Sequence, residues 1–254
     1  MPGFDLLLDR YTLRARIGPA LLMILPASLG AFAWYPGQAT LPESAMGVIV
    51  GLVLALLLGQ FVRDAGFQKE RELFQSWDGP PTTRFLRHRD QQLGGSTRAR
   101  YHQCLTRLLP DLQLPSVSDE DRDPIAADQV YESCTRHLRE KTRSAGDFHL
   151  VHETNTEYGF RRNLWAVKPT GVGLAVLGTI ATSARLGMAY AHSEPIAAAT
   201  LAGAVLSTSL LVWWWRRITP SWVRVAADSY AERLLATCEV LAPQPSVGPR
   251  IVAP

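Results

Sequence analysis

Hydrophobic residues gather in two blocks of the sequence, and charged residues lie before, between and after these blocks. A bilayer core about 30 Å thick needs roughly 20 mostly apolar residues in one helix. Backbone groups in lipid must form their hydrogen bonds within their own segment, so each long apolar run is expected to be a helix. The pattern predicts two transmembrane hairpins, 17–62 and 169–215, built from apolar runs at 17–35, 45–62, 170–191 and 196–215.

Basic residues at the ends of these runs predict how the hairpins are oriented. The links inside the hairpins, 36–44 and 192–195, contain no Lys or Arg. The opposite ends are flanked by Arg10, Arg14, Arg16, Arg63, Lys69, Arg161, Arg162, Lys168, Arg216, Arg217 and Arg224. Since basic loops stay in the cytoplasm, both termini and the segment 63–168 are predicted to be cytoplasmic.

A cleaved signal peptide is the alternative interpretation of the first run, because Ala31-Phe32-Ala33 resembles a cleavage site. The apolar character continues through Trp34 and Tyr35, however, and this favours a retained span.

The regions outside the spans show apolar positions at helical spacing and no alternating strand pattern. The second run continues as a stalk to Trp77, and residues 110–123 are expected to be an acidic loop. Ser96 is expected to cap one helix and Pro124 to begin another. The fold class is therefore all-α, with these parts: an N-terminal segment 1–16, the two hairpins, a cytosolic helical domain 63–168, a C-terminal helix 216–241 and a disordered tail 242–254.

Composition adds one restriction on the class of protein. The 254 residues are 47% hydrophobic and 19% charged, with 26 basic and 23 acidic side chains, which excludes a disordered chain. All three cysteines fall in the predicted cytosolic parts, where no disulfide is expected.

Enzyme and metal chemistry find little support in the sequence. His102, Cys104, Cys134 and His137 have spacings that zinc could use, but both cysteines also fit the apolar faces of their helices. No catalytic constellation is present, so the sequence predicts neither an enzyme, nor a metal site, nor a cofactor.

An arginine cluster lies in the predicted cytosolic domain. Residues 84–107 contain six arginines and one aspartate, a net charge of +5. The cluster surrounds a glycine-rich segment whose backbone N–H groups could hold an anion, and guanidinium groups match phosphate oxygens. A phosphate-bearing ligand, anionic lipid and a solvated face remain open, and the ligand residues would be Arg84, Arg87, Arg89, Gly94, Gly95, Ser96, Arg98 and Arg100.

Two patterns inside the spans suggest assembly and conduction. Small residues at every fourth position, Gly47, Gly51, Ala55 and Gly59, allow close helix packing, either between subunits or within one chain. Arg185 is a charge inside a span and follows a polar stripe; it lines a pore or reaches out to the headgroups. The candidate pore residues are Thr179, Thr182, Ser183 and Arg185.

Two segments resemble signatures of a family of bacterial membrane proteins: 77–90 (WDGPPTTRFLRHRD) and 158–165 (YGFRRNLW), the latter followed by Lys168-Pro169. Two hairpins around a cytosolic domain with an arginine cluster also resemble the small membrane effectors of bacterial anti-phage systems. The Hailong effector, a channel held shut by a nucleic-acid signal, is of this kind. The resemblance is one of architecture and transfers no functional residue.

Together these patterns predict a homo-oligomeric channel-type effector in the bacterial inner membrane. Its partners would be membrane lipid, further copies of itself and a nucleotide or short nucleic acid that gates it. The alternative is a non-conducting membrane anchor or scaffold that recruits a cytosolic protein partner.

Overall fold

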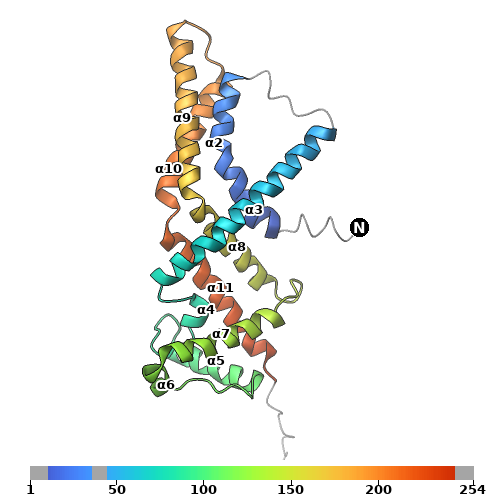
Figure 1. Cartoon of the computed structure of the whole chain (residues 1–254), viewed down its shortest axis with the longest axis vertical. Helices are drawn as coiled ribbons and strands as arrows, with labels where there is room; N and C mark the ends of the chain where they lie inside the picture. Colours follow the sequence, from blue (N-terminus) through green and yellow to red (C-terminus); the bar gives the residue numbers. More distant parts are fainter. Residues whose placement is uncertain (1–10, 36–44, 244–254) are drawn as a thin grey trace, which may run out of the picture. The chain divides into compact units, whose positions relative to one another are not determined.

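The computed structural model describes residues 11–35 and 45–243, and of residues 45–50 only the backbone. Within these ranges the regular structure is helical and contains no strand, as the sequence predicts. The elements in Figure 1 are η1 (Thr12–Ile17), α2 (Gly18–Trp34), α3 (Ala45–Ser76), α4 (Pro81–Arg84), α5 (Gly95–Leu108), α6 (Val117–Arg122), α7 (Pro124–Lys141), α8 (His149–Ala166), α9 (Lys168–Ala191), α10 (Ala198–Arg217) and α11 (Pro220–Leu241).

Three helical segments among the described residues are long and apolar enough to cross a membrane: Thr12–Trp34, Lys168–Ala191 and Ala198–Arg217. They suggest a multi-pass membrane protein and coincide with three of the four predicted runs. The remaining run, 45–62, lies in α3, and its first side chains fall outside the described residues. The hairpin link 36–44 and the predicted tail beyond residue 243 also lie outside them.

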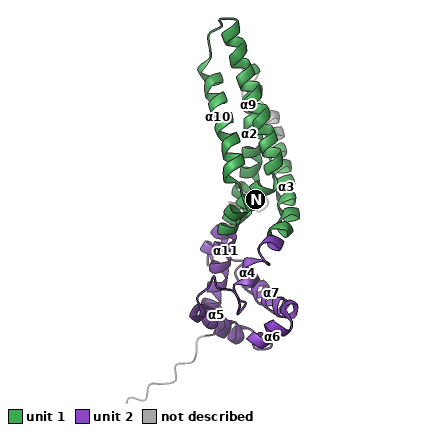
Figure 2. Cartoon of the chain, turned by 90° about the vertical axis from the view of Figure 1, so that its left-hand side faces the viewer, with its two compact units in different colours: residues 1–73, 155–226 green, residues 74–154, 227–254 purple. Residues whose placement is uncertain are grey.

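The chain divides into two compact units, shown in Figure 2. Unit 1 comprises residues 1–73 and 155–226, and unit 2 comprises residues 74–154 and 227–254. The chain passes from one unit to the other within α3, within α8 and within α11. Unit 2 therefore contains most of the predicted cytosolic domain together with the second half of α11.

In unit 1, α2, α9 and α10 pack side by side (Figures 1 and 2). Glycines permit the closest approaches: a Cβ at Gly178 would lie 2.1 Å from the carbonyl oxygen of Pro26, and one at Gly171 would lie 2.7 Å from the Trp214 ring. Trp214 is fully buried and packs in a core with Met23 and Leu164. These three helices therefore form a bundle held by close backbone packing.

In unit 2, α5, α7 and α11 bury one hydrophobic core. Its central side chains include Phe85, Leu105, Tyr131 and Leu234, none more than 1% exposed. The loop expected at 110–123 was wrong in part, because α6 occupies residues 117–122. A capping box explains this helix: the backbone N–H of Asp119 donates to Ser116 Oγ, and the N–H of Ser116 donates to the Asp119 carboxylate.

Candidate functional site

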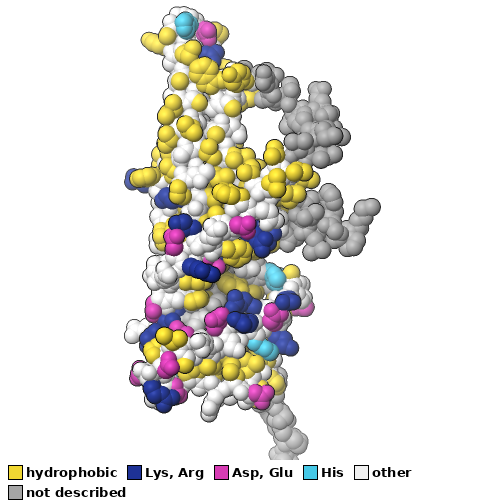
Figure 3. Space-filling view, in the orientation of Figure 1, with side chains coloured by type: hydrophobic (Ala, Val, Ile, Leu, Met, Phe, Trp, Pro, Cys, Tyr) yellow, Lys and Arg dark blue, Asp and Glu magenta, His cyan; other side chains and the backbone are white. Residues whose placement is uncertain are grey.

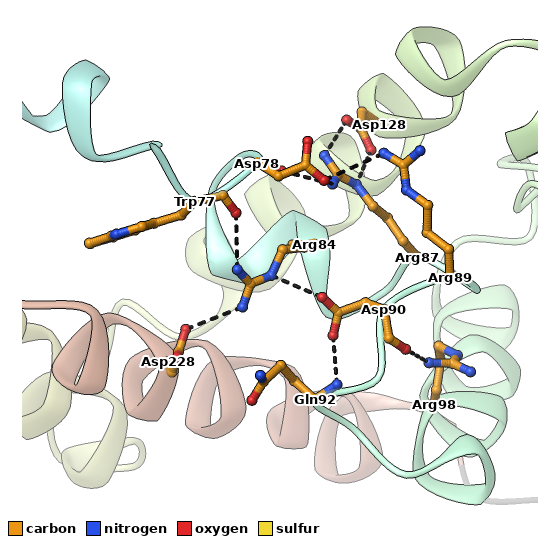
Figure 4. A network of polar contacts seen from close by, with 10 residues as sticks. All are labelled: Trp77, Asp78, Arg84, Arg87, Arg89, Asp90, Gln92, Arg98, Asp128 and Asp228. Atoms are coloured by element: carbon orange, nitrogen blue, oxygen red, sulfur yellow. Dashed lines mark hydrogen bonds and ion pairs between the residues drawn. The ribbon is translucent and has the colours of Figure 1, made fainter. Parts of the chain in front are cut away.

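The arginines of segment 77–90 form the centre of a polar network in unit 2 (Figure 4). Arg84, on α4, has a side chain only 6% exposed. Its Nε lies 2.9 Å from Asp90 Oδ2, its Nη1 donates to the carbonyl oxygen of Trp77 at 3.0 Å, and its Nη2 lies 3.7 Å from Asp228 on α11. Arg84 thus connects the residue that follows α3 to α11.

Arg87 makes the strongest contacts of the network. Its Nε and Nη2 donate to the two carboxylate oxygens of Asp128, at 2.7 and 2.6 Å, in a bidentate pair. Its Nη1 donates to both the carbonyl and the carboxylate of Asp78, each at 2.7 Å. Burial lowers the pKa of Arg87, but the carboxylates of Asp128 and Asp78 more than offset this, and the pKa is raised.

The turn after α3 is shaped to receive Arg87. Asp78 and Gly79 both have positive φ, 61° and 107°, and the Gly79 N–H donates to the carbonyl oxygen of Phe74. A Cβ at Gly79 would lie 2.9 Å from Arg87 Nη2. Glycine is therefore required at position 79 for its backbone conformation and for the space that it leaves.

Acidic residues outside segment 84–107 neutralise much of the predicted arginine cluster. Asp78, Asp128 and Asp228 pair with Arg84 and Arg87, and Glu239 on α11 pairs with Arg100. These carboxylates lie outside the segment whose net charge the sequence gave as +5. Arg84 and Arg87 are consequently buried beside acidic partners inside unit 2.

The other predicted ligand residues lie at the surface around the start of α5. Arg89 is half exposed and lies 3.7 Å from Asp78, while Arg98 donates to the carbonyl oxygen of Asp90. Ser96 does not cap α5 as expected. Gly94 occupies the N-cap position, without a side-chain hydrogen bond, and neither Gly94 nor Gly95 has a neighbour within 4 Å of a built Cβ. The first turn of α5 therefore presents open backbone.

The second signature, segment 158–165, forms a network in unit 1 that the sequence did not predict. Arg162, 4% exposed, donates from Nη1 to Glu70 at 2.8 Å, and Tyr158 donates to the same carboxylate oxygen at 2.6 Å. Asn163 accepts from Arg162 and donates to the carbonyl oxygen of Ala15 in the π-helix η1 at 2.7 Å. This network connects η1, α3 and α8.

Gly66 is required for that network. A Cβ at Gly66 would lie 2.0 Å from Asn163 Oδ1, well inside any real contact. The pattern Tyr-Gly-Phe-Arg-Arg-Asn on α8 was a visible signal, but its partners Glu70 and Ala15 lie about ninety and about one hundred and fifty residues away. Sequence spacing could not connect them.

The four predicted pore residues differ in exposure. Thr182 is fully buried and its Oγ donates to the carbonyl oxygen of Gly178 at 2.8 Å; its Cγ2 lies 3.8 Å from a Cβ built at Gly203 of α10. Thr179 is half buried and Ser183 is exposed. Arg185 pairs with Glu194, which follows α9, at 3.1 Å.

The small-residue face of α3 also divides. A Cβ at Gly59 would lie 3.4 Å from Ile17, so this position packs within the chain. Gly51 has no neighbour within 4 Å, and Ala55 is half buried. The side chain of position 47, also a predicted packing residue, lies outside the described residues.

Two of the four residues with spacings that zinc could use, His102 and Cys134, have other contacts. His102 Nε2 donates to the carbonyl oxygen of Leu86 at 2.7 Å, and Cys134 is fully buried, which raises the pKa of its thiol to about 11. In the described part of the chain no three His, Cys, Asp or Glu side chains form a metal-binding group.

Comparison with protein families, curated proteins and solved structures finds no match to this chain. Its function is therefore argued from its own residues.

Proposed function

We propose that this protein is the subunit of a homo-oligomeric, channel-type membrane effector that a phosphate-bearing ligand gates at unit 2. The start of α5 carries the proposal. Exposed backbone at Gly94-Gly95, with no side-chain cap, lies within a segment that also presents Arg89 and Arg100. Backbone N–H groups at a helix start and guanidinium forks together suit a nucleotide or a short nucleic acid.

The ion pairs at this surface leave room for a ligand. Arg100 and Glu239 have side chains 58% and 38% exposed, and Asp78, which faces Arg89, is 74% exposed. Exposed pairs contribute little free energy, so a phosphate group can replace a carboxylate at low cost. Arg84 and Arg87 position this segment and do not bind the ligand in this proposal.

The buried network supports a route from unit 2 to the spans. Arg84 and Arg87 hold the residues that follow α3 against α7 and α11. In sequence, α3 begins in the apolar run 45–62, and α11 follows the candidate span α10. A ligand that shifts residues 89–100 would displace Asp90, the partner of Arg84. Arg84 in turn contacts Trp77 just after α3 and Asp228 within α11.

Assembly would use the free half of α3. Figure 1 shows this end of α3 leading away from α2, α9 and α10, and Val53, Leu54 and Leu57 are about half exposed. In an oligomer these side chains and the open Gly51 would pack against another copy, in the bacterial inner membrane with both termini and unit 2 in the cytoplasm. The architecture also supports a role in anti-phage defence.

A second candidate function is a non-conducting anchor that recruits a cytosolic protein. The burial of Thr182 inside the α2–α9–α10 bundle favours it, because a residue enclosed in one chain cannot line a pore between chains. Planar bilayer recording on the purified protein separates the two candidates. Steady unitary currents support the channel, and their absence in both the presence and the absence of nucleotides supports the anchor.

Ligand binding is tested by titrating the purified chain with nucleotides and short single strands at several salt concentrations. Each phosphate neutralised on a single strand should contribute a log–log slope of about −0.7. Arg89→Gln with Arg100→Gln should weaken binding and flatten the slope. The matched control is Arg122→Gln with Arg143→Gln, which removes two exposed arginines elsewhere in unit 2. Equal effects of the two pairs would reject a ligand site at α5.

A further inference from the structure

The last turn of α10 carries two arginines that are unlike most other basic residues of unit 1. Most of the others have partners: Arg14 and Arg161 pair with Glu157, and Arg162 pairs with Glu70. Arg216 and Arg217 are exposed, and their guanidinium groups make no hydrogen bond or ion pair with the described part of the chain. These two adjacent charges are therefore available to a partner outside this chain.

The end of α10 does not need these arginines. Carbonyl groups in the last turn of a helix lack intrahelical donors and attract basic side chains. Here Lys168 takes that role, because its Nζ donates to the carbonyl oxygens of Trp215 and Ile218 at 3.0 and 2.7 Å. The two guanidinium groups are therefore free to point outward.

Along α10 the exposed side chains change from apolar to aromatic to basic, in the order expected at a membrane boundary. Leu201, Val205 and Val212 on α10 are exposed apolar side chains, each more than half exposed. Trp215 follows, 68% exposed, and Arg216 and Arg217 end the candidate span. Hydrocarbon, headgroup boundary and phosphate layer favour apolar, indole and guanidinium groups in this same order. On the face shown in Figure 3, hydrophobic side chains likewise cover much of unit 1, and Lys and Arg side chains gather towards its lower end.

We propose that Trp215, Arg216 and Arg217 form a binding site for the phosphodiester headgroups of anionic phospholipids. Successive residues on a helix point about 100° apart, so the two arginines reach separate phosphate groups on either side of one helix face. Guanidinium groups donate two parallel hydrogen bonds to such oxygens. The exposed indole packs beside them at headgroup depth. The site is independent of the nucleotide site proposed at α5.

The test is titration of the full-length protein in neutral detergent with phosphatidylglycerol or phosphatidylcholine, followed by native mass spectrometry. Each basic residue near an anionic surface contributes roughly fivefold in affinity. Arg216→Gln with Arg217→Gln should therefore raise the apparent Kd for the first phosphatidylglycerol by up to about thirtyfold and leave phosphatidylcholine binding unchanged.

The control pair is Arg122→Gln with Arg143→Gln, which removes the same charge from unit 2 and should change the Kd less than twofold. Arg216→Lys with Arg217→Lys keeps the charge and should retain the preference for phosphatidylglycerol. Water-soluble glycerophosphoglycerol should compete only weakly, because it lacks the acyl chains that would pack against the exposed apolar side chains of α10. The proposal would be overturned by an unchanged Kd in the glutamine pair or by full competition from the soluble headgroup. An equal loss of affinity in the control pair or in the lysine pair would also overturn it.

Discussion

Arg87 in unit 2 and Arg162 in unit 1 are both buried, but their charges are compensated differently. The guanidinium of Arg87 contacts two carboxylates, Asp128 and Asp78, whose own side chains are 33% and 74% exposed. The guanidinium of Arg162 contacts a single carboxylate, Glu70, an amide, and the face of Phe67 at 4.3 Å.

The difference follows from the surroundings of each arginine. Unit 2 recruits acidic residues from α7 and from the turn after α3, whereas the helices of unit 1 offer few acids near the apolar spans. Polar amide and aromatic groups complete the shell there. The groups that compensate a buried arginine in this protein are therefore seen in its spatial contacts and not in the charges of neighbouring residues in the sequence.

The largest expected effect comes from breaking the unit 2 network. Arg87→Met should lower the free energy of unfolding of unit 2 by about 3 kcal/mol, because it leaves two carboxylates facing each other without their cation. The stability of Arg87→Lys should lie between those of the wild type and Arg87→Met. An ammonium group cannot bind Asp128 bidentately and contact Asp78 at the same time. Chemical denaturation followed by far-UV circular dichroism measures both.

Arg136→Met is the matched control for that series. Arg136, on α7 of unit 2, also pairs with a carboxylate, Glu132, but its side chain is 72% exposed. Its replacement should change stability little. A comparable loss in both variants would show that the bidentate contact of Arg87 is not what stabilises unit 2.

The unit 1 network is tested by one substitution at two positions of α3. Gly66→Ala places a Cβ against Asn163 Oδ1 and should lower stability by about 2 kcal/mol through overpacking. Gly51→Ala meets nothing within 4 Å and should raise stability by up to about 1 kcal/mol, as alanine favours helix. Thermal unfolding in detergent compares them, and equal shifts would contradict the contact between Gly66 and Asn163.

These networks also show what the sequence could and could not predict. Some helix bounds followed from local signals: Pro124 begins α7 as expected. The acidic partners of the arginines could not be predicted from local signals, because Arg87 and Asp128 are forty-one residues apart and no spacing rule connects them. A local charge sum consequently overstated the positive surface at 84–107. The capping box at Ser116 was readable in the sequence, but the acidic composition of 110–123 concealed it.

A smaller effect should come from pH, through His102 in the unit 2 core. Burial lowers the pKa of His102, and the neighbouring side chains of His88 and Arg98 lower it further, while the Leu86 carbonyl and Glu120 oppose this. Tyr131 lies beside the same ring, and its pKa is raised by burial and by Glu120. The folded state therefore favours neutral His102, whereas the unfolded chain binds the proton near pH 6.5.

The direction of this pH dependence follows from the difference between the folded and unfolded pKa values of His102. The stability from neutral His102 is fully present above about pH 6.5 and is lost as pH falls towards the lower folded pKa. Between pH 7 and pH 5.5 the free energy of unfolding should fall by at most about 1 kcal/mol. His102→Gln should flatten this dependence, and the exposed His149→Gln should not. Denaturant midpoints measured at the two pH values give this dependence for the wild type and both variants. An equal change with pH in all three proteins would show that His102 is not its cause.

The smallest effect concerns Arg185, whose side chain is 32% exposed and whose partner, Glu194, is 48% exposed. Arg185→Glu brings two carboxylates together and should lower stability by only about 0.5 kcal/mol, in contrast to the buried Arg87. Arg185→Glu with Glu194→Arg restores the pair and should restore stability. The same variants test the pore proposal in bilayer recordings. If Arg185 lines a conducting path, the single change shifts the reversal potential towards cations, and the exchange shifts it back, because selectivity follows the charge along the passage. If the pair lies outside any path, neither variant changes the reversal potential, and Arg185 serves only to join α9 to the link before α10.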